Sequence, residues 1–303
     1  MVRQDERRRI GIDLGGTKIE AILLDASGAA LGRVRVGAPR GDYDATVRAI
    51  VGLVEELESG SGAQASVGVG TPGAISPATG RIKNSNSVWL NGRPLGEDLA
   101  RALSREVRLA NDADCFALSE ATDGAAAGAP VVFGAILGTG VGGGIVARGR
   151  LISGPNAIAG EWGHNALPWP RDDERPGPDC YCGRRGCIET FVSGPGLERD
   201  HAERSGAHAP AAEVVARAAS GEALANDTLE RYAERLARAL ASLINLLDPH
   251  VIVLGGGLSN IPQLYARVPA LWSSWVFSDR VDTRLVPPRH GDSSGVRGAA
   301  WLW

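Results

Sequence analysis

The sequence has few cysteines and histidines, no long hydrophobic run and no excess of positive charge. Only four cysteines and five histidines occur among 303 residues, which argues against the disulfide framework of small secreted domains. No apolar run reaches the ~18 residues of a membrane-spanning helix, and no signal-peptide core follows the start. The net charge of −3 differs from the basic excess of proteins that bind nucleic acid or anionic membranes. We therefore expect a cytoplasmic globular protein without nucleic-acid or membrane partners.

The composition is that of an ordinary globular protein. Apolar residues make up 44% and charged residues 22% of the chain, and this length predicts one large or two modest domains. The run RQDERRR at 3–9 is mixed in sign, and we interpret it as a solvated tail.

Three of the four cysteines lie close to one histidine in the sequence. Cys180, Cys182 and Cys187 form the spacing C-x-C-x4-C, and His164 precedes them. Three thiolates and one imidazole make a closed tetrahedral zinc set with no position left for a reactive water, so the predicted metal is structural. The usual zinc spacing is C-x2-C, so the alternative interpretation is three thiols without a metal.

Hydrophobic patterning predicts an α/β protein. Apolar runs at 9–14, 19–24 and 31–36, separated by turn residues, predict an antiparallel meander. Helical spacing predicts one helix from Thr46 to Glu58 and another from Leu229 to Leu247 that ends at Asp248-Pro249. Further predicted elements are a strand at 66–70, a strand ending near Ala110, a helix beginning near Asp112, a strand within 251–257 and a short C-terminal helix.

The first hairpin is repeated in outline near the middle of the chain. DLGGT at 13–17 is echoed by LGTGVGG at 137–143, each between apolar strands, which indicates two similar α/β lobes. Glycine turns that follow strands expose backbone N–H groups to anionic ligands, and three such turns suggest a nucleotide. The G-x-G-x-x-G patterns that begin at Gly68 and Gly138 lack the strand-to-helix context of a dinucleotide fold, and no Walker A sequence occurs.

Six segments together resemble the ROK family (repressors, open reading frames and kinases), in particular its sugar kinases. These segments are DLGGTK at 13–18, LANDA at 109–113, LGTGVGGG at 137–144, GEWGH at 160–164, CYCGRRGCIE at 180–189 and VIVLGGG at 251–257. The resemblance extends from Ile10 to Trp303. It implies an α/β fold of two duplicated ribonuclease-H-like lobes of the hexokinase and actin type, with sugar and ATP in the cleft between them.

The resemblance also implies a division of the chain. We expect an N-terminal lobe at 1–110, with the C-terminal helix 292–303 packed on it, and a C-terminal lobe at 111–291 that carries the zinc-binding insertion 160–189. ROK repressors have an additional N-terminal helix-turn-helix domain. The short segment before the first predicted strand leaves no room for that domain, which argues against a repressor.

Individual roles follow from the same resemblance. Asp112 would be the catalytic base that accepts the proton of the attacking sugar hydroxyl; from the residues alone, a helix cap is the alternative. His164 would bind zinc with one ring nitrogen and face the sugar with the other. The implied sugar ligands are Gly73, Asn86, Asn111, Asp112, Glu161, His164 and Glu189. The implied zinc ligands are His164, Cys180, Cys182 and Cys187. The implied ATP and Mg²⁺ site comprises Asp13, which helps to hold Mg²⁺, together with Gly15, Gly16, Thr17, Lys18, Gly138, Thr139, Gly140, Gly255, Gly256 and Gly257.

The implied activity is the ATP-dependent phosphorylation of a hexose, with Mg²⁺ at the phosphates and a structural Zn²⁺. Segments 83–95, 160–169 and 290–303 resemble the fructokinase (mannofructokinase) branch, so we expect D-fructose phosphorylated at O6, with mannose as a second substrate. N-acetylglucosamine kinase and glucokinase of the same family are alternatives, and a sugar-sensing regulator without catalysis is an alternative of a different class. The expected partners are the sugar, ATP and a second copy of the chain in a homodimer.

Overall fold

A computed structural model describes residues 8–62 and 64–303, so most of the basic run at 3–9 lies outside the described residues. The chain forms two compact units. Unit 1 contains the described residues up to Gly128, residues 144–159 and Arg289–Trp303, and unit 2 contains Ala129–Gly143 and Gly160–Pro288. The chain therefore passes from one unit to the other four times. The lobe boundary expected at residue 110 stays a prediction.

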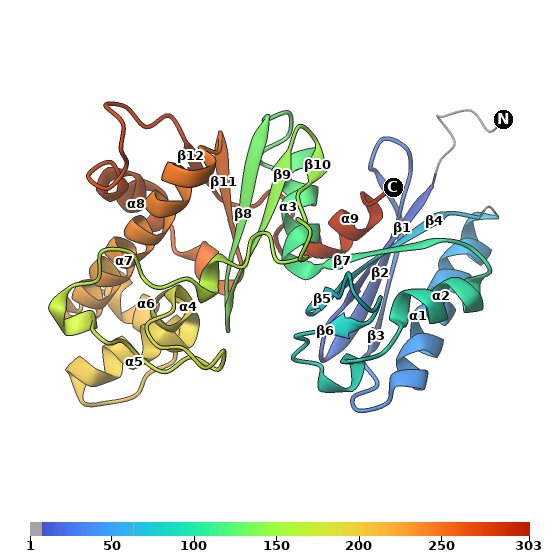
Figure 1. Ribbon diagram of the computed structural model, residues 1–303, viewed down its shortest axis with the longest axis horizontal. Coiled ribbons are helices and arrows are strands. Elements are labelled where there is room, and N and C mark those ends of the chain that lie inside the picture. The colour runs from blue at the N-terminus through green and yellow to red at the C-terminus, as the bar shows by residue number, and fades with distance from the viewer. Residues whose placement is uncertain (1–7, 63) are drawn as a thin grey trace. The chain divides into compact units, whose positions relative to one another are not determined.

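The first sheet belongs to unit 1 and has the strand order β3-β2-β1-β4-β7 (Figure 1). Its strands are β1 (Arg9–Leu14), β2 (Lys18–Leu24), β3 (Ala30–Gly37), β4 (Ser66–Thr71) and β7 (Val107–Asn111). β2 pairs antiparallel with β1 and β3, which confirms the predicted meander. β4 and β7 extend the sheet in parallel from β1. The carboxyl ends of β1, β4 and β7 therefore lie at one edge, where a site can form.

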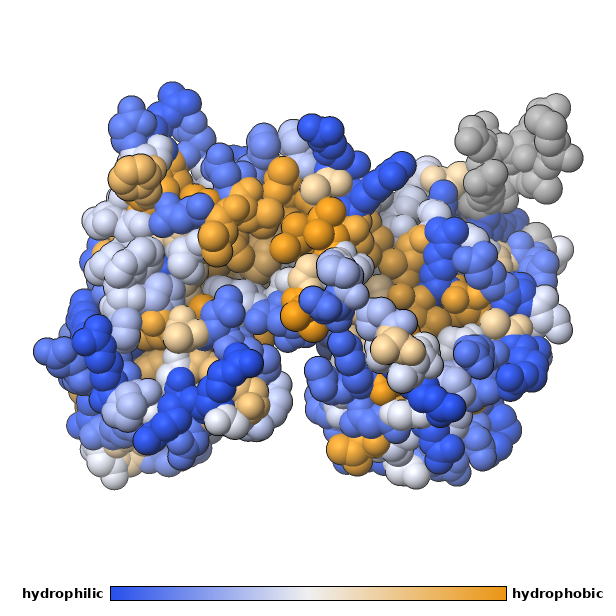
Figure 2. All heavy atoms as spheres, viewed as in Figure 1, coloured by the Kyte–Doolittle hydropathy of each residue, from blue (hydrophilic) through white to orange (hydrophobic). Residues whose placement is uncertain are grey.

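The first helix of unit 1 is α1 (Tyr43–Ser61), which is longer at both ends than predicted. Asp42 caps its start by accepting a hydrogen bond from the Ala45 N–H at 2.9 Å, and Gly62 ends it in the left-handed region. Its apolar residues, including Ile50 and Leu53, are buried in one core with β1 and β4. Figure 2 shows mainly hydrophilic side chains over α1 and α2 on the face drawn. The other elements of this unit are β5 (Ala74–Ile75), β6 (Ile82–Lys83), η2 (Val88–Leu90), α2 (Leu95–Leu103), α3 (Asp112–Thr122), η6 (Gly291–Ser293) and α9 (Ser294–Ala300).

The C-terminal helix α9 packs directly on the first sheet. Glycines in two strands permit this approach. A Cβ at Gly11 of β1 would lie 2.0 Å from the Val296 carbonyl oxygen, and a Cβ at Gly68 of β4 would lie 1.9 Å from that of Ala299. Any larger residue at these two positions would push α9 off the sheet.

The second sheet repeats the arrangement of the first. Its order is β10-β9-β8-β11-β12, with β8 (Val131–Leu137), β9 (Val141–Ala147), β10 (Arg150–Leu151), β11 (Val251–Gly255) and β12 (Arg284–Val286). As in the first sheet, three strands that follow one another in the sequence lie side by side, here β8, β9 and β10. β11 then pairs in parallel with β8, and β12 pairs in parallel with β11. The internal repeat predicted from the glycine turns is therefore present in the sheet topology.

Helices and turns of unit 2 carry the cysteine segment. They are η3 (Trp162–His164), η4 (Asp172–Glu174), α4 (Ile188–Val192), α5 (Gly194–Ser205), α6 (Ala211–Ala219), α7 (Ala223–Leu247), η5 (Gly257–Asn260) and α8 (Leu264–Trp272). α7 ends at Leu247, as predicted, and its C-cap Asp248 adopts the left-handed conformation before Pro249; the helix begins at Ala223, earlier than the predicted Leu229. Within the described residues, the helices are all too short or too polar to cross a membrane.

Candidate active site and metal centre

Asp112 is the first residue of α3, directly after β7. Asn111 caps this helix: its side-chain oxygen accepts a hydrogen bond from the Ala113 N–H at 2.9 Å, and its amide nitrogen donates to the Gly73 carbonyl at 2.9 Å. The Asp112 carboxylate accepts from the same Ala113 N–H at 2.8 Å. Since Asn111 occupies the cap position, the structure does not require Asp112 as the helix cap. Three predicted sugar-binding residues, Gly73, Asn111 and Asp112, are thus brought together.

Gly73 fits this position because of its conformation and its surroundings. Its φ of +81° is strained for other residues, and a Cβ there would lie 2.4 Å from the Lys83 carbonyl oxygen. The glycine therefore lets the loop after β4 lie directly beside the start of α3.

Asp13 lies at the same sheet edge, on β1. Asp13 pairs in register with Gly70 of β4, and Gly70 pairs with Ala110 of β7. Burial and the nearby negative charges of Asp112 and Glu20 raise the pKa of Asp13 to about 6, although Lys18 opposes this shift. Burial and a second carboxylate destabilise the charged form of Asp13. A divalent cation bound here would offset both negative charges. These residues therefore fit the Mg²⁺ role implied for Asp13.

The predicted phosphate loop of unit 1 is the turn between β1 and β2. The Gly15 N–H donates to the Lys18 carbonyl at 3.0 Å, and a Cβ at Gly15 would lie 2.9 Å from that oxygen. Arg40 donates to the Gly16 carbonyl at 3.0 Å and places a guanidinium at this loop. Thr17 is exposed. Two cationic side chains, Lys18 and Arg40, thus flank a glycine turn, and the resemblance had implied only the first.

Asn86 lies near this phosphate loop. Its neighbours Ser85 and Ser87 are buried, whereas Asn86 is exposed. A Cβ built on Gly16 would lie 3.5 Å from the Ser87 hydroxyl. The structure therefore places the segment that carries Asn86 beside the phosphate loop of its own unit.

The other two glycine turns lie against each other in unit 2. Gly255 ends β11 in register with Ile136 of β8, and a Cβ at Gly256 would lie 2.4 Å from the Leu137 carbonyl oxygen. Residues 138–140 follow directly after β8, and 255–257 follow β11. Both predicted nucleotide-binding turns of this unit therefore leave adjacent parallel strands at the same end.

Glu189 connects the second glycine turn with the start of α4. Its carboxylate accepts a hydrogen bond from the Val141 N–H at 2.9 Å. A Cβ at Gly140 would lie 2.8 Å from the same carboxylate oxygen, so glycine leaves the space that this oxygen occupies. One residue predicted to bind sugar thus touches the turn predicted to bind phosphate. Glu161, which precedes η3, is exposed.

The four predicted zinc ligands form one cluster in unit 2. The ligand atoms of His164, Cys180, Cys182 and Cys187 all lie within 4.8 Å of one another. The His164 Nδ1 to Cys180 Sγ distance and the Cys182 Sγ to Cys187 Sγ distance are both 3.6 Å. Zinc bonds of about 2.0–2.3 Å in tetrahedral geometry give ligand separations of about 3.5–3.8 Å. The cysteines are free thiols, and the cluster therefore fits a zinc ion.

The chemistry of the cluster also favours a cation. Burial and hydrogen bonding to Cys182 and Cys180 raise the pKa of Cys187 to about 12, so this thiol needs a bound metal ion to ionise near neutral pH. Glycines at 183 and 186, both with positive φ, provide the tight turns between the second and third cysteines.

The structure shows a partner of His164 that sequence reasoning missed. The His164 Nε2 lies 2.9 Å from the Tyr181 hydroxyl, and the two rings meet edge to face at 5.1 Å. His164 therefore faces the cysteines with Nδ1 and a tyrosine with Nε2. The only sequence signal for this contact is the position of Tyr181 between the two predicted ligands Cys180 and Cys182.

The chain is similar to known proteins over almost its whole length. The sequence model of the ROK family matches residues 9–303. A protein named N-acetyl-D-glucosamine kinase from Pectobacterium atrosepticum is 42% identical over 296 residues, which cover 96% of this chain and 97% of that protein. One of the same name from Yersinia pseudotuberculosis matches equally well, at 42% identity over 296 residues.

Solved structures extend the comparison to the fold. The ROK hexokinase from Thermus thermophilus is similar with a TM-score of 0.87 at 32% identity, over 97% of each chain. A ROK family glucokinase from Streptomyces griseus, solved with glucose and AMPPNP, gives 0.79 at 26% identity, over 97% of this chain and 98% of that one. These similarities confirm the predicted α/β class with its duplicated lobes. On the match of the family model and of these relatives, the chain belongs to the ROK family.

Proposed function

We propose that this protein is an ATP- and Mg²⁺-dependent sugar kinase that phosphorylates N-acetyl-D-glucosamine. The observation that carries the proposal is the 42% identity, over 96% of the chain, to proteins named N-acetyl-D-glucosamine kinase. It is supported by a set of carboxylates, glycine turns and thiols that suits phosphoryl transfer to a polyol.

Asp112 is the proposed base. The γ-phosphoryl group of ATP passes to the oxygen of the primary sugar hydroxyl, the bond to the ADP oxygen breaks, and the hydroxyl proton moves to the Asp112 carboxylate. The Ala113 N–H bond, 2.8 Å long, holds this carboxylate in a fixed orientation. Asp13 would hold Mg²⁺ through its carboxylate. Without the ion, burial and the charges of Asp112 and Glu20 raise the pKa of Asp13 to about 6, and a bound cation would favour the charged form.

Four of the proposed sugar ligands stand at the ends of short helical elements. Asn111 and Asp112 stand at the start of α3, Glu189 stands at the start of α4, and His164 ends η3. An amide can donate and accept hydrogen bonds with sugar hydroxyls, whereas a carboxylate accepts them. His164 would bind a sugar hydroxyl through Nε2 in place of the Tyr181 hydroxyl, which lies 2.9 Å from that nitrogen. A zinc ion on the four-residue cluster would fix the position of His164 and supply no reactive water, because all four of its positions are occupied.

The expectation of fructose as substrate is not supported, and N-acetyl-D-glucosamine fits the comparisons better. In segment 290–303, a Cβ at Gly298 of α9 would lie 1.6 Å from the Cys115 carbonyl oxygen, and in segment 83–95 Asn91 bonds the Ser85 backbone twice at 2.9 Å. These two residues serve packing and a turn, so their likeness to fructokinases is a poor guide to the sugar.

The test is ADP release with N-acetyl-D-glucosamine, fructose, mannose and glucose at matched concentrations. The expected result is the highest kcat/KM with N-acetyl-D-glucosamine. A higher value with fructose would restore the first expectation, and no turnover with any of these sugars would refute the kinase.

Asp112→Asn tests the base separately. Turnover is expected to fall by roughly two to four orders of magnitude, since general base catalysis contributes about 10²–10⁴-fold, whereas sugar binding measured by calorimetry persists. Asp44→Asn is a matched control, because Asp44 is also an acidic residue in the first turn of a helix and is exposed. Near-normal turnover of Asp112→Asn would remove Asp112 from this role.

A further inference from the structure

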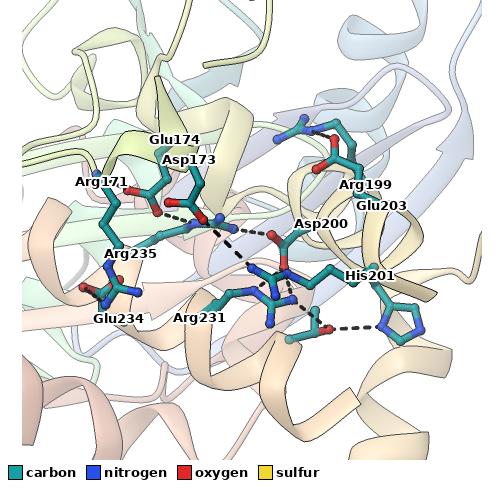
Figure 3. A network of polar contacts seen from close by, with 12 residues as sticks. Arg171, Asp173, Glu174, Arg199, Asp200, His201, Glu203, Arg231, Glu234 and Arg235 are labelled. Atoms are coloured by element: carbon teal, nitrogen blue, oxygen red, sulfur yellow. Dashed lines mark hydrogen bonds and ion pairs between the residues drawn. The ribbon is translucent and has the colours of Figure 1, made fainter. Parts of the chain in front are cut away.

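Three arginines on α7 form a network with acidic residues of unit 2. Arg231, Arg235 and Arg238 occur at helical spacing on α7, and the side chains of Arg235 and Arg238 are 8% and 0% exposed. Three carboxylates balance their charges: Glu174, Asp200 and Glu234. Figure 3 shows Arg235 between Glu174 and Asp200, and Arg231 on the far side of Asp200. Fully buried arginines are rare without such partners.

Glu174 is the acceptor on which two of these arginines converge. One carboxylate oxygen accepts from Arg235 at 2.7 Å and from Arg238 at 2.8 Å, and the other accepts from Arg238 at 2.9 Å. That second oxygen also accepts from the Arg171 N–H at 2.8 Å. Arg238 donates further to the Trp169 carbonyl at 2.7 Å. The arginines thus hold both the side chain and the backbone of this segment.

The segment they hold lies between two zinc ligands. Residues 165–179 connect His164, the last residue of η3, to Cys180. The short turn η4 is the longest regular element in these residues. Hydrogen bonds within the segment therefore fix its position only in part. The carbonyl and carboxylate contacts to α7 fall near the middle of this connection, at Trp169 and Glu174.

The same face of α7 also holds α4, the helix that begins with the Ile188-Glu189 pair. The Arg235 guanidinium lies 5.3 Å from the centroid of the Phe191 ring, and the buried Tyr232 hydroxyl donates to the Val192 carbonyl at 2.9 Å. α7 therefore contacts the chain on both sides of the cysteine segment.

From these contacts we infer that Glu174, held by Arg235 and Arg238, is a positioning residue for the zinc cluster and for Glu189. It fixes residues 165–179 on α7, so that His164 and Cys180 meet at one ion and α4 keeps its orientation. Glu174 touches neither sugar nor metal in this role. The part of the inference that concerns sugar rests on the proposed function, whereas the part that concerns zinc does not.

A buried ion pair is a costly way to gain stability alone. The desolvation of both charges offsets most of their attraction, and apolar residues of similar volume often stabilise a protein as well or better. What the forked, bidentate pair adds is a defined geometry. Here the geometry is imposed on the connection between two metal ligands, where small displacements separate atoms that lie only 3.6 Å apart.

Glu174→Gln tests the inference, because it keeps the size of the side chain and removes its charge. Zinc release to an excess of a chromogenic chelator is the first measurement, and the KM values for N-acetyl-D-glucosamine and for ATP are the second. We expect zinc release to accelerate roughly 10- to 100-fold, as for other residues that support metal ligands. The sugar KM should rise at least about tenfold by the same reasoning, and the ATP KM should stay within about twofold.

Two further variants separate positioning from general stability. Glu174→Asp keeps the carboxylate and should recover part of both effects. Glu230→Gln is the matched control: Glu230 also lies on α7 and pairs with Arg267, but both side chains are half-exposed and distant in sequence from the cysteine segment. This control should leave zinc release and the sugar KM unchanged. All assays are run where circular dichroism shows folded protein, and if Glu174→Gln does not fold, Arg235→Lys and Glu174→Asp replace it.

Three results would overturn the inference. Purified wild-type protein could contain no zinc, Glu174→Gln could release zinc at the wild-type rate, or Glu230→Gln could match Glu174→Gln in both measurements. Failure of the proposed function is distinguishable from these results. If no sugar is phosphorylated, the proposed kinase falls, and the zinc release rates alone decide the role of Glu174.

Discussion

Gly140→Ala is the sharpest single test of the contact between the second glycine turn and Glu189. The added Cβ would lie 2.8 Å from the Glu189 carboxylate oxygen, so the carboxylate must move by several tenths of an ångström to reach van der Waals distance. That oxygen accepts the 2.9 Å bond from Val141. The backbone conformation at Gly140 is not a left-handed one, so the alanine acts through its methyl group alone.

The magnitude follows from the bond that is disturbed. A hydrogen bond to a charged group contributes about 1.5–3 kcal/mol, which corresponds to roughly 10- to 150-fold in an equilibrium constant. We therefore expect kcat/KM for N-acetyl-D-glucosamine to fall by about 10- to 100-fold, with most of the effect in the sugar KM.

The assay is steady-state ADP release with varied sugar at saturating ATP. Gly52→Ala is the control, because Gly52 lies in α1, outside the proposed site, and a Cβ there meets nothing within 4 Å; its sugar KM should equal that of the wild type. A sugar KM of Gly140→Ala equal to that of the wild type would refute the argument.

Three other predictions concern stability. Hydrogen bonds from Arg238 and Arg235 outweigh the effect of burial and lower the pKa of Glu174 from 4.5 to about 2. In the unfolded state this carboxyl group is protonated below about pH 4.5, so about 3 kcal/mol of unfolding free energy should be lost as the pH falls towards 2. Urea titrations across this pH range should show that slope in the wild type and a flatter one in Glu174→Gln, and equal slopes would contradict the assignment. Removal of zinc by a chelator should lower the thermal midpoint and the sugar affinity together, and an unchanged midpoint would contradict a structural metal. Gly298→Ala places a Cβ 1.6 Å from the Cys115 carbonyl and should cost about 3 kcal/mol or more in urea unfolding, whereas Gly52→Ala, which meets nothing within 4 Å, should cost none.

The sequence predicted those parts of the fold that depend on local patterns. Short apolar runs bounded by turn residues located β1, β2 and β3 almost to the residue, and β1 and β2 are buried along most of their length. The glycine echo between 13–17 and 137–143 predicted two similar sheets before their strand order was known. The cysteine spacing predicted a cluster whose four ligand atoms the structure brings within 4.8 Å of one another.

Long-range contacts were not predictable from these patterns. Arg235 and Arg238 stand in the apolar stripe of α7 at helical spacing, which is a signal for buried charges, but nothing local identifies Glu174 as their partner 61 and 64 residues away. Likewise the cap of α3 was expected near Asp112, and the structure assigns it to Asn111 because that side chain can also reach Gly73. The motifs also did not predict the preferred sugar: segment 290–303 resembles the fructokinase branch, yet its helix α9 packs on the first sheet.

The packing of α9 on β1 has a consequence for synthesis on the ribosome. The Val296 carbonyl fits against Gly11, yet residues 294–300 are translated almost a whole chain length after β1. At a translation rate of about 5–20 residues per second, β1 waits roughly 15 to 60 s for the helix that covers it. The first sheet is therefore exposed while unit 2 is being made, and a chaperone that shields apolar strands would act on the beginning of this chain.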